Sequence, residues 1–383
     1  MQLLRLAGPP GVGKSTIAWA LASRSAAAGR PTGYVDIDQL GMLYPPPADD
    51  ADRVALKERA LRAVAREHRA AGVEQLVVSG VASPDDAPPA IAGITVRSLW
   101  CDAAPAVLRE RLAVRGWDEE QVAEVVAAGT AESARLHPDW ERLGIGELTI
   151  TQAVERVLER IDQPEEAARS TADPRAENHS PLRPTTPPGH MPPILWLTGP
   201  RCAGASSVGW ALAADAWSQR TRTAFLDLAQ LAFATGATGQ DTAPGRPLRH
   251  HALALRILVA LRTVLRAAGA RELLVVAPLE VDVTELLGAP ETGVMTMVRL
   301  DADDATLRER VGARARGAPP LLASDDLRGA PASQIDAVAD LAAKQRKCPL
   351  RAGEQQVTNA ERTPTTTAAA IRRLGTAERR AHP

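Results

Sequence analysis

The sequence predicts an α/β fold that is built twice, as two consecutive three-layer α/β/α domains, each with a parallel sheet. Three observations lead to this prediction. Short apolar runs alternate with stretches of helical periodicity. A glycine-rich turn joins the first apolar run to the first helical stretch. The first half of the chain also recurs, in weaker form, in the second half.

The apolar runs of the first half are short and bounded by turn residues. Gly29 and Gly72 follow the first two helical stretches, and glycine commonly ends a helix because it tolerates positive φ. The run 75–79 (QLVVS) is nearly all apolar, which is typical of a strand buried on both faces of a parallel sheet. The expected strands are residues 2–7, 32–36, 75–79, 94–101 and 148–150, and the expected helices are residues 15–28, 50–71, 105–115 and 151–161.

The second half follows the first at a nearly constant spacing. Gly8 aligns with Gly199 and Asp36 aligns with Asp227, each 191 residues later. Farther along, the spacing drifts by a few residues, which small loop insertions explain. The order of the matching blocks is preserved, so we expect a tandem duplication.

The repeat divides the chain into four parts. We expect a first domain at residues 1–162, a flexible linker at 163–190, a degenerate second domain at 191–316 and a poorly defined C-terminal segment at 317–383. The linker is rich in Pro, Ser, Thr and charge and has almost no large apolar residues, so it buries too little surface to become ordered. The similarity fades after about residue 316, and the Ala-, Thr- and Arg-rich tail is expected to be partly disordered.

Composition disfavours several classes of protein. The 383 residues carry 45 Lys plus Arg against 46 Asp plus Glu, so we expect no nucleic-acid or anionic-membrane partner. No apolar run approaches the roughly 18 residues of a membrane span, and the N-terminus does not resemble a signal peptide. The three cysteines are far apart in the sequence and predict neither a disulfide framework nor a zinc site. We therefore expect a cytoplasmic protein.

The most specific motif is GPPGVGKS at residues 8–15, which matches GxxxxGK[ST] throughout and lies between an expected strand and an expected helix. Glycines let successive backbone N–H groups surround a phosphate, and the helix N-terminus adds positive potential. Lys14 would contact the β- and γ-phosphates of ATP, and the Ser15 hydroxyl would ligate Mg²⁺. The expected nucleotide-binding residues are Gly8, Pro9, Pro10, Gly11, Val12, Gly13, Lys14, Ser15 and Thr16.

The second copy of this loop, GPRCAGAS at residues 199–206, has Ala205 in place of the lysine. A methyl group cannot offset the charge of a triphosphate, so we expect a structural copy that binds no nucleotide. Arg201 lies inside the loop and is an alternative source of positive charge.

With the loop GPPGVGKST, the strand end YVDIDQL and the arginine helix LRERLAVRG, the first half resembles the small-molecule kinase branch of P-loop proteins. Adenylylsulfate kinase, chloramphenicol phosphotransferase, the zeta-toxin kinases and polynucleotide kinase belong to this branch. The resemblance covers about residues 1–160 and, more weakly, 193–316. It implies a P-loop NTPase fold, ATP and Mg²⁺ as cofactors, and phosphoryl transfer to a small molecule.

In that branch an acidic residue after the second strand faces the acceptor hydroxyl, and Asp36 and Asp38 occupy this place. A carboxylate there can orient the hydroxyl or take its proton, and can bind Mg²⁺ through water. The second half keeps the first carboxylate as Asp227 but has Ala229 in place of the second. This favours Asp38 as the catalytic residue and Asp36 as a structural residue or Mg²⁺ ligand. Two solvated turn carboxylates are the alternative.

The resemblance also implies that arginines of a lid helix contact the phosphates. Arg111 and Arg115 share one helix face, so they are expected at the transferring group. The second half keeps its arginines without the lysine, which favours the alternative of a solvated basic face paired with Glu110. His68 has no partner at metal-ligand spacing and is expected on the surface.

The leading hypothesis is an ATP- and Mg²⁺-dependent phosphotransferase that acts on a small-molecule hydroxyl. The N-terminal copy would be catalytic, and the C-terminal copy would pack against it as a structural or regulatory pseudo-kinase. The third strand ends in Ser79 and Gly80 without an acid, which disfavours a motor-type ATPase. A nucleotide-binding regulatory protein and a slow ATPase without an acceptor are the open alternatives.

Overall fold

The computed structural model describes residues 1–114, 116–162, 191–235, 251–283, 294–318 and 327–381. The chain forms two compact units, and neither is one continuous stretch of sequence. Unit 1 combines Met1–Gly41, Lys57–Pro181 and Ala232–Arg249, and unit 2 combines Met42–Leu56, Leu182–Leu231 and His250–Pro383. The expected linker at 163–190 lies outside the described residues.

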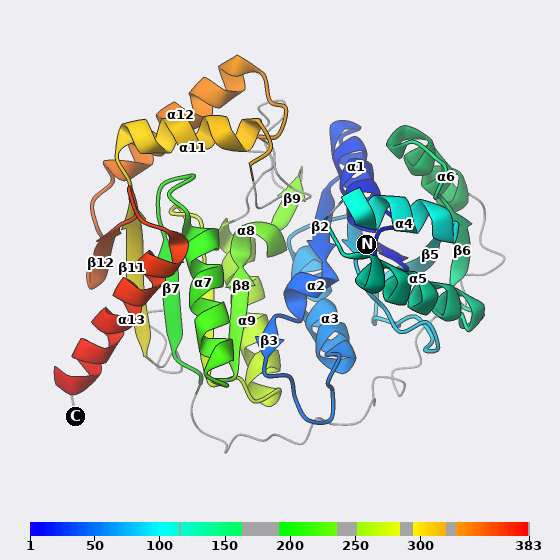
Figure 1. Cartoon of the computed structure of the whole chain (residues 1–383), viewed down its shortest axis with the longest axis horizontal. Helices are drawn as coiled ribbons and strands as arrows, with labels where there is room; N and C mark the ends of the chain where they lie inside the picture. The colour runs from blue at the N-terminus through cyan, green and yellow to red at the C-terminus, as the bar shows by residue number, and fades with distance from the viewer. Residues whose placement is uncertain (115, 163–190, 236–250, 284–293, 319–326, 382–383) are drawn as a thin grey trace. The chain divides into compact units, whose positions relative to one another are not determined.

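Unit 1 is a six-stranded sheet flanked by helices, with the strand order β6-β5-β1-β4-β2-β9 (Figure 1). Neighbouring strands pair in parallel except for β9, which runs antiparallel to β2 at one edge. The strands are β1 (Gln2–Ala7), β2 (Thr32–Asp36), β4 (Gln75–Ser79), β5 (Thr95–Asp102), β6 (Glu141–Gly144) and β9 (Phe233–Thr235). The helices are α1 (Lys14–Ala27), α2 (Ile37–Leu40), α3 (Val54–Ala70, which begins in unit 2), α4 (Pro105–Val114), α5 (Glu119–Ala134) and α6 (Ile150–Asp162).

Unit 2 is a second six-stranded sheet with helices packed on it, in the order β12-β11-β7-β10-β8-β3. Here too the edge strand β3 is antiparallel to its neighbour β8, and the other pairs are parallel. The strands are β3 (Leu43–Tyr44), β7 (Ile194–Thr198), β8 (Thr223–Asp227), β10 (Glu272–Val276), β11 (Met295–Asp301) and β12 (Glu354–Thr358). The helices are α7 (Ala205–Ser218), α8 (Leu228–Leu231), α9 (His251–Ala267), α11 (Asp304–Ala315), α12 (Ala332–Arg346) and α13 (Pro364–Ala381).

The predicted α/β fold class is confirmed, because both sheets are mostly parallel and carry helices. When the strands of each repeat are counted from its own start, the first five strands of the order are the same in both sheets. This agreement supports the tandem duplication proposed from the sequence. The sixth position differs: the edge strand of unit 1 comes from the second repeat, and the edge strand of unit 2 comes from the first.

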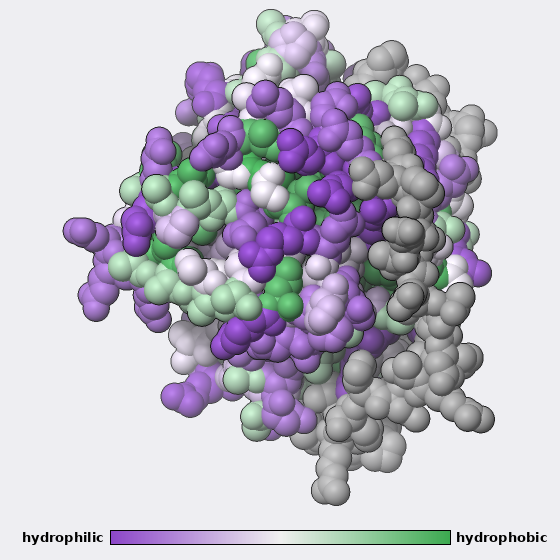
Figure 2. All heavy atoms as spheres, turned by 90° about the vertical axis from the view of Figure 1, so that its right-hand side faces the viewer, coloured by the Kyte–Doolittle hydropathy of each residue, from purple (hydrophilic) through white to green (hydrophobic). Residues whose placement is uncertain are grey.

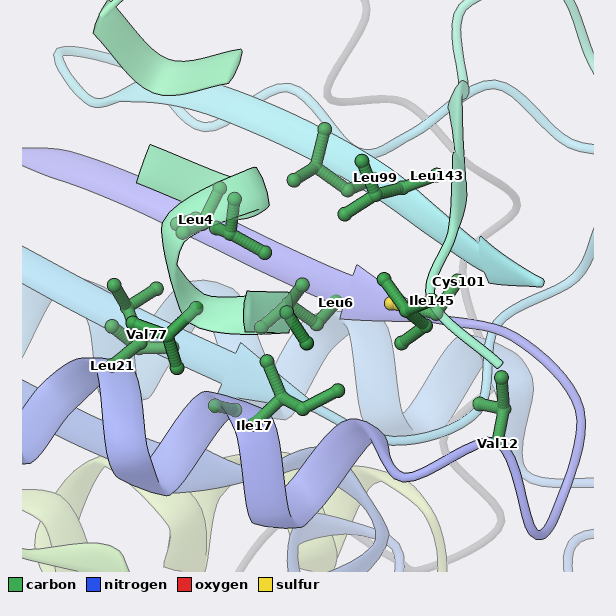
Figure 3. Close-up of a cluster of buried hydrophobic side chains, with 14 of the residues drawn as sticks. Leu4, Leu6, Val12, Ile17, Leu21, Val77, Leu99, Cys101, Leu143 and Ile145 are labelled. Carbon is green, nitrogen blue, oxygen red and sulfur yellow. The ribbon is translucent and has the colours of Figure 1, made fainter. Parts of the chain in front are cut away.

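The core of unit 1 lies between the sheet and α1 (Figure 3). Successive residues of a strand point to opposite faces, so Leu4 and Leu6 of β1 turn toward Ile17 and Leu21 of α1 (Figure 3). All four side chains are at most 5% exposed. The loop between β1 and α1 is therefore held at both ends by buried apolar packing.

Two expectations differ from the structure. The short strand expected at 148–150 is absent from the described residues: β6 is Glu141–Gly144, and α6 begins at Ile150. The segment 317–383, expected to be poorly defined, supplies α12, β12 and α13 of unit 2. Its sequence has lost similarity to the first half but keeps an apolar pattern, since β12 pairs with β11 and Ile371 is buried in the core.

Figure 2 views the side of the molecule that carries α5 and α6 at the right of Figure 1. Polar side chains cover most of this face, and apolar side chains show in smaller areas between them (Figure 2). Among the described residues, no helix is both long enough and apolar enough to cross a membrane.

Candidate active site

The phosphate loop of unit 1 joins β1 to α1 at the carboxyl end of the sheet. Gly8 has φ +138°, and an added Cβ would collide with the carbonyl oxygen of Cys101. Gly13 adopts the left-handed conformation and directly precedes α1. A side chain at either position would disturb the turn, so the glycines are needed to bring backbone N–H groups close to an anion.

Lys14 is folded over this loop. Its side chain is 8% exposed, and Nζ donates to the carbonyl oxygen of Pro9 across 2.8 Å. The ammonium group therefore lies across the mouth of the loop, where it would meet the phosphates of a bound nucleotide. The sequence assigned Lys14 this place, and Pro9 and Val12 of the same loop are buried with it.

A relay of hydroxyl groups runs under the loop. Ser79 of β4 donates to Ser15 across 3.4 Å, and Ser15 donates to Asp36 Oδ2 across 3.2 Å. The Tyr34 hydroxyl lies 3.0 Å from Ser79 Oγ and donates to it, because the Ser79 proton is committed to Ser15. Each hydroxyl thus donates a hydrogen bond to the next oxygen, and the Asp36 carboxylate is the last acceptor.

Two residues of this relay, Ser79 and Tyr34, are not among the candidate site residues that the sequence predicts. Both stand on strands next to the loop, in β4 and β2. The signal available in the sequence is the second repeat, where the aligned residues are Val276 and Phe225, which carry no hydroxyl.

Asp36 and Asp38 converge above Gly80. A Cβ added to Gly80 would lie 3.2 Å from Asp36 Oδ1 and 3.3 Å from Asp38 Oδ2. The Asp36 carboxylate also accepts the Asp38 backbone N–H across 3.0 Å and so caps the short helix α2. Burial raises the pKa of Asp36 above its ordinary value, and the charge of Asp38 raises it further. A cation between the two carboxylates would relieve both effects.

Asp38 forms an ion pair with Lys57 of α3, with Nζ and Oδ1 2.9 Å apart. The Lys57 side chain is 9% exposed and that of Asp38 is 44% exposed. Asp38 therefore has one oxygen held by Lys57, while its side chain as a whole stays partly open to solvent. Lys57 was not singled out in the sequence, since lysine on a polar helix face is ordinary.

Arg111 of α4 is bonded to the backbone of the phosphate loop. Its two terminal nitrogens donate to the carbonyl oxygens of Val12 and Gly146, each across 2.8 Å. It is thus neither the solvated face paired with Glu110 nor directed at a phosphate in this structure, and its contact with the transferring group stays a prediction. Arg115 lies outside the described residues.

Beside Arg111 is a cavity of about 380 Å³. It opens between the phosphate loop, α4 and the segment that joins β6 to α6. Its walls include Gly13, Thr16, Arg111, Val114, Ile145 and Leu148. The lining is mostly apolar, and its polar side chains are the Arg111 guanidinium, the Glu110 carboxylate and the Thr16 hydroxyl, which suits a planar ring system with a few polar edges.

Comparisons with known proteins concern the fold. The chain is similar in structure to an unliganded sugar kinase from Janibacter sp. HTCC2649, with 21% identity and a TM-score of 0.31 over 42% of this chain and 95% of that one. Shikimate kinase from Bacteroides thetaiotaomicron matches at 18% identity and a TM-score of 0.29, over 42% and 98%. A gluconokinase from Sinorhizobium meliloti 1021 matches at 19% identity and a TM-score of 0.27, over 41% and 90%.

The other comparisons give no relative. No protein-family model matches the chain. No curated protein matches it either.

The corresponding loop of unit 2 is filled by the protein's own side chains. The backbone N–H of Arg201 donates to Gln345 Oε1 across 2.7 Å, and Asn359 Nδ2 donates to the carbonyl oxygen of Ala203 across 2.7 Å. Cys202, where the first loop has Gly11, has a φ of +64° that favours glycine. Gln345 thus takes up a backbone N–H group that a phosphate would need.

Arg310 explains why the arginine helix is retained in the second repeat. It donates to the carbonyl oxygens of Ala203 and Asn359, as Arg111 donates to those of Val12 and Gly146. In both units this arginine ties the loop to the segment after the outer strand. That structural task does not need a loop lysine.

The residues of unit 1 fit Mg²⁺ and a nucleotide. Mg²⁺ prefers oxygen ligands, takes few of them from protein and completes its shell with phosphates and water. Ser15 and Asp36 offer such oxygens, and the Ser15 proton points to Asp36, which leaves a lone pair of Ser15 Oγ for a cation. Among the described residues, no group of three or more His, Cys, Asp or Glu forms a metal site of another kind.

Proposed function

We propose that the chain is an ATP- and Mg²⁺-dependent phosphotransferase whose acceptor is the hydroxyl of a small molecule, with the reaction in unit 1. The observation that carries the proposal is the convergence of four groups at the carboxyl ends of the strands of unit 1. These are the glycine-rich loop, the Lys14 ammonium, the Ser15–Asp36 pair and the half-exposed Asp38 carboxylate. Each group serves a different part of phosphoryl transfer, and the second repeat lacks two of them.

The loop and Lys14 would hold the β- and γ-phosphates. Backbone N–H groups and an ammonium neutralise charge that spreads over the oxygens of the transferring group. Ser15, with Asp36 behind it, would hold Mg²⁺, which would supply positive charge to offset that of the phosphates. The base of the nucleotide would enter the cavity next to Arg111, whose guanidinium forms part of the wall.

Asp38 would orient the acceptor hydroxyl and receive its proton. The Lys57 ion pair fixes one carboxylate oxygen of Asp38, so the other can accept a hydrogen bond from the substrate hydroxyl. Asp36 is less suited to this task because both its oxygens already accept hydrogen bonds, from Ser15 and from the backbone of Asp38.

Unit 2 would bind no ATP. Its loop has Ala205 for the lysine, and Gln345 and Asn359 occupy backbone groups of that loop. Its role would be structural or regulatory within the chain.

Slow ATP hydrolysis is the second candidate. One observation favours it: the Asp38 side chain is 44% exposed, so solvent water reaches this carboxylate. A water molecule in the acceptor place would then receive the phosphoryl group.

The deciding experiment follows the label of γ-labelled ATP incubated with the full chain, Mg²⁺ and pools of metabolites separated by class. We expect label in a hydroxyl-bearing metabolite. Label found only in free phosphate would favour hydrolysis, and tight MgATP binding with no turnover would favour a nucleotide-binding regulatory protein. Lys14→Ala serves as the negative control because it removes the loop ammonium without altering a core side chain.

A further inference from the structure

The two repeats exchange their edge segments. The chain leaves unit 1 after Gly41, and Met42–Leu56 belongs to unit 2 before the chain returns at Lys57. In the opposite direction, Ala232–Arg249 of the second repeat belongs to unit 1. Each exchanged segment contributes the antiparallel edge strand of the sheet that it joins, β3 in unit 2 and β9 in unit 1.

The segment Met42–Leu56 is firmly bound within unit 2. Phe225 N–H donates to the carbonyl oxygen of Met42 across 2.8 Å, and Leu43 is fully buried. Arg222 donates from Nε to the carbonyl oxygen of Pro45 across 3.1 Å and from a terminal nitrogen to that of Pro46 across 3.3 Å. The Tyr44 ring lies 4.8 Å from that of Trp217.

The two ends of this segment lie at the acceptor side of the candidate site. Asp38 precedes it by four residues, and Lys57 follows it directly. The Asp38–Lys57 ion pair joins the two ends of the segment Met42–Leu56. Gly41 packs so closely on the Lys57 side chain that a Cβ there would lie 2.6 Å from Lys57 Cε. Asp50, inside the segment, accepts the backbone N–H groups of Ala55 and Leu56 and so caps α3 one turn before Lys57.

The reciprocal segment supports the hydroxyl relay. Phe233 of β9 is 6% exposed and lies 4.6 Å, ring to ring, from Trp19. Trp19 in turn lies 5.4 Å from Tyr34, the first hydroxyl of the relay. Thr235 and Phe233 also contact Thr32 and His68 through hydrogen bonds, with His68 fully buried rather than at the surface as expected.

We propose that the second repeat is a positioning element for the catalytic site of the first, which it holds through the exchanged segments, with Arg222 as the main positioning residue for the Asp38–Lys57 pair. This inference rests on the proposed function for its consequence in catalysis. The covalent path is short: three residues separate Asp38 from Met42, and none separates Leu56 from Lys57. If the segment Met42–Leu56 becomes more mobile within unit 2, both partners of the Asp38–Lys57 ion pair become more mobile too. A less well oriented Asp38 lowers the rate of phosphoryl transfer. The loop at residues 8–16 lies outside this path.

The test compares Arg222→Ala with Arg351→Ala in the full chain. Arg351 is a matched control because it also donates to two backbone carbonyls of unit 2, those of Leu279 and Val281, which lie outside the exchanged segment. Hydrogen exchange is measured by mass spectrometry on peptides that cover residues 36–41, MgATP affinity by calorimetry, and transfer from γ-labelled ATP to the metabolite pool.

In the Arg222→Ala variant we expect the backbone amide hydrogens of residues 36–41 to exchange with solvent about tenfold faster than in the wild type. We also expect about a tenfold loss of label transfer with unchanged MgATP affinity, and partial recovery of both in Arg222→Lys. Arg351→Ala should leave exchange at 36–41 and transfer unchanged. Should Arg222→Ala fail to fold, Arg222→Lys and Arg222→Gln supply the same comparison.

Faster exchange confined to residues 42–47, with 36–41 as in the wild type, would overturn the inference. Equal effects of Arg222→Ala and Arg351→Ala on 36–41 would also overturn it, because they would reflect a general loss of stability. A wild-type chain that transfers no label contradicts the proposed function instead, while the exchange measurement still decides whether unit 2 positions residues 36–41.

Discussion

Ser15 Oγ donates to Asp36 Oδ2 across 3.2 Å, and the same pair recurs in the second repeat as Ser206 and Asp227, 2.7 Å apart. The serine–aspartate contact is thus present in both repeats, whereas the loop lysine is present only in the first, as Lys14, and is replaced by Ala205 in the second. A contact kept in both repeats supports the local fold, since it joins the first turn of a helix to the end of the neighbouring strand. A group kept in one repeat is the better indicator of chemistry.

Lys14→Ala should abolish most of the activity without unfolding unit 1. Its Nζ donates to the loop carbonyl of Pro9, while its charge would offset that of the triphosphate. We expect turnover to fall by a factor of about 10² to 10³. Label transfer from γ-labelled ATP measures this, and circular dichroism checks the fold.

Arg201→Ala is the control for that measurement, because Arg201 is the positive residue inside the second loop. If Arg201 supplied charge to a nucleotide in unit 2, its removal would lower the number of MgATP molecules bound per chain. We expect one molecule bound per chain in both the wild type and Arg201→Ala. Two binding events in the wild type would contradict the assignment of unit 2 as a structural copy.

Ser15→Ala and Ser206→Ala form a matched pair, since each removes one hydroxyl from the same serine–aspartate contact. Ser15→Ala should weaken MgATP binding about tenfold, because a ligand of the cation and its orienting bond are lost together. Ser206→Ala should lower the melting temperature slightly and leave MgATP affinity unchanged. Calorimetry with and without Mg²⁺ separates the two, and equal losses of affinity would contradict the proposed site.

The fold and the phosphate loop could be predicted because their signals are local. The loop motif, the strand end at Asp36 and the alternation of strands and helices all lie within short windows of sequence. The edge strands could not be predicted, since β3 has two residues and β9 has three, and their partners are far away in the chain. The role of Lys57 was hidden for the same reason: its ion pair with Asp38 depends on where the intervening segment goes.

Asp38→Asn should cost more activity than Asp36→Asn. The Asp38 side chain is 44% exposed and has one oxygen paired with Lys57, whereas both oxygens of Asp36 accept hydrogen bonds, from Ser15 and from the backbone of Asp38. We expect Asp38→Asn to lower kcat about a hundredfold with little change in MgATP affinity. Asp36→Asn should mainly weaken Mg²⁺-dependent binding. The reverse order in kcat would make Asp36 the acceptor-side residue.

Glu132 should make the stability of the chain depend on pH. Burial raises the pKa of this α5 carboxyl above its ordinary value of 4.5, and the charges of Lys14 and Arg135 oppose the rise. A raised folded-state pKa means that its contribution to stability is full below pH 4.5 and is lost as pH rises through the folded-state value. Glu132→Gln should therefore raise the melting temperature at pH 7 more than at pH 4. A larger gain at pH 4 would contradict the direction of the shift.

The hydroxyl relay gives the most specific prediction, because the second repeat supplies the substitutions that remove it. Val276 and Phe225 align with Ser79 and Tyr34, so an equivalent β-sheet position already accommodates the apolar side chains. Ser79→Val removes the bond to Ser15, and Tyr34→Phe removes the bond to Ser79. Without these donors the Ser15 hydroxyl can turn away from Asp36, and a misoriented ligand holds Mg²⁺ less well.

We expect Ser79→Val to raise the Mg²⁺ concentration needed for half-maximal transfer about tenfold, with a smaller effect for Tyr34→Phe, which lies one step farther from the cation. Combining either with Ser15→Ala should add almost nothing, because all three act through the same hydroxyl. Effects that simply add would show that Ser79 and Tyr34 contribute to stability alone. The melting temperature of each variant, measured without nucleotide, separates a loss of packing from a loss of ligand orientation.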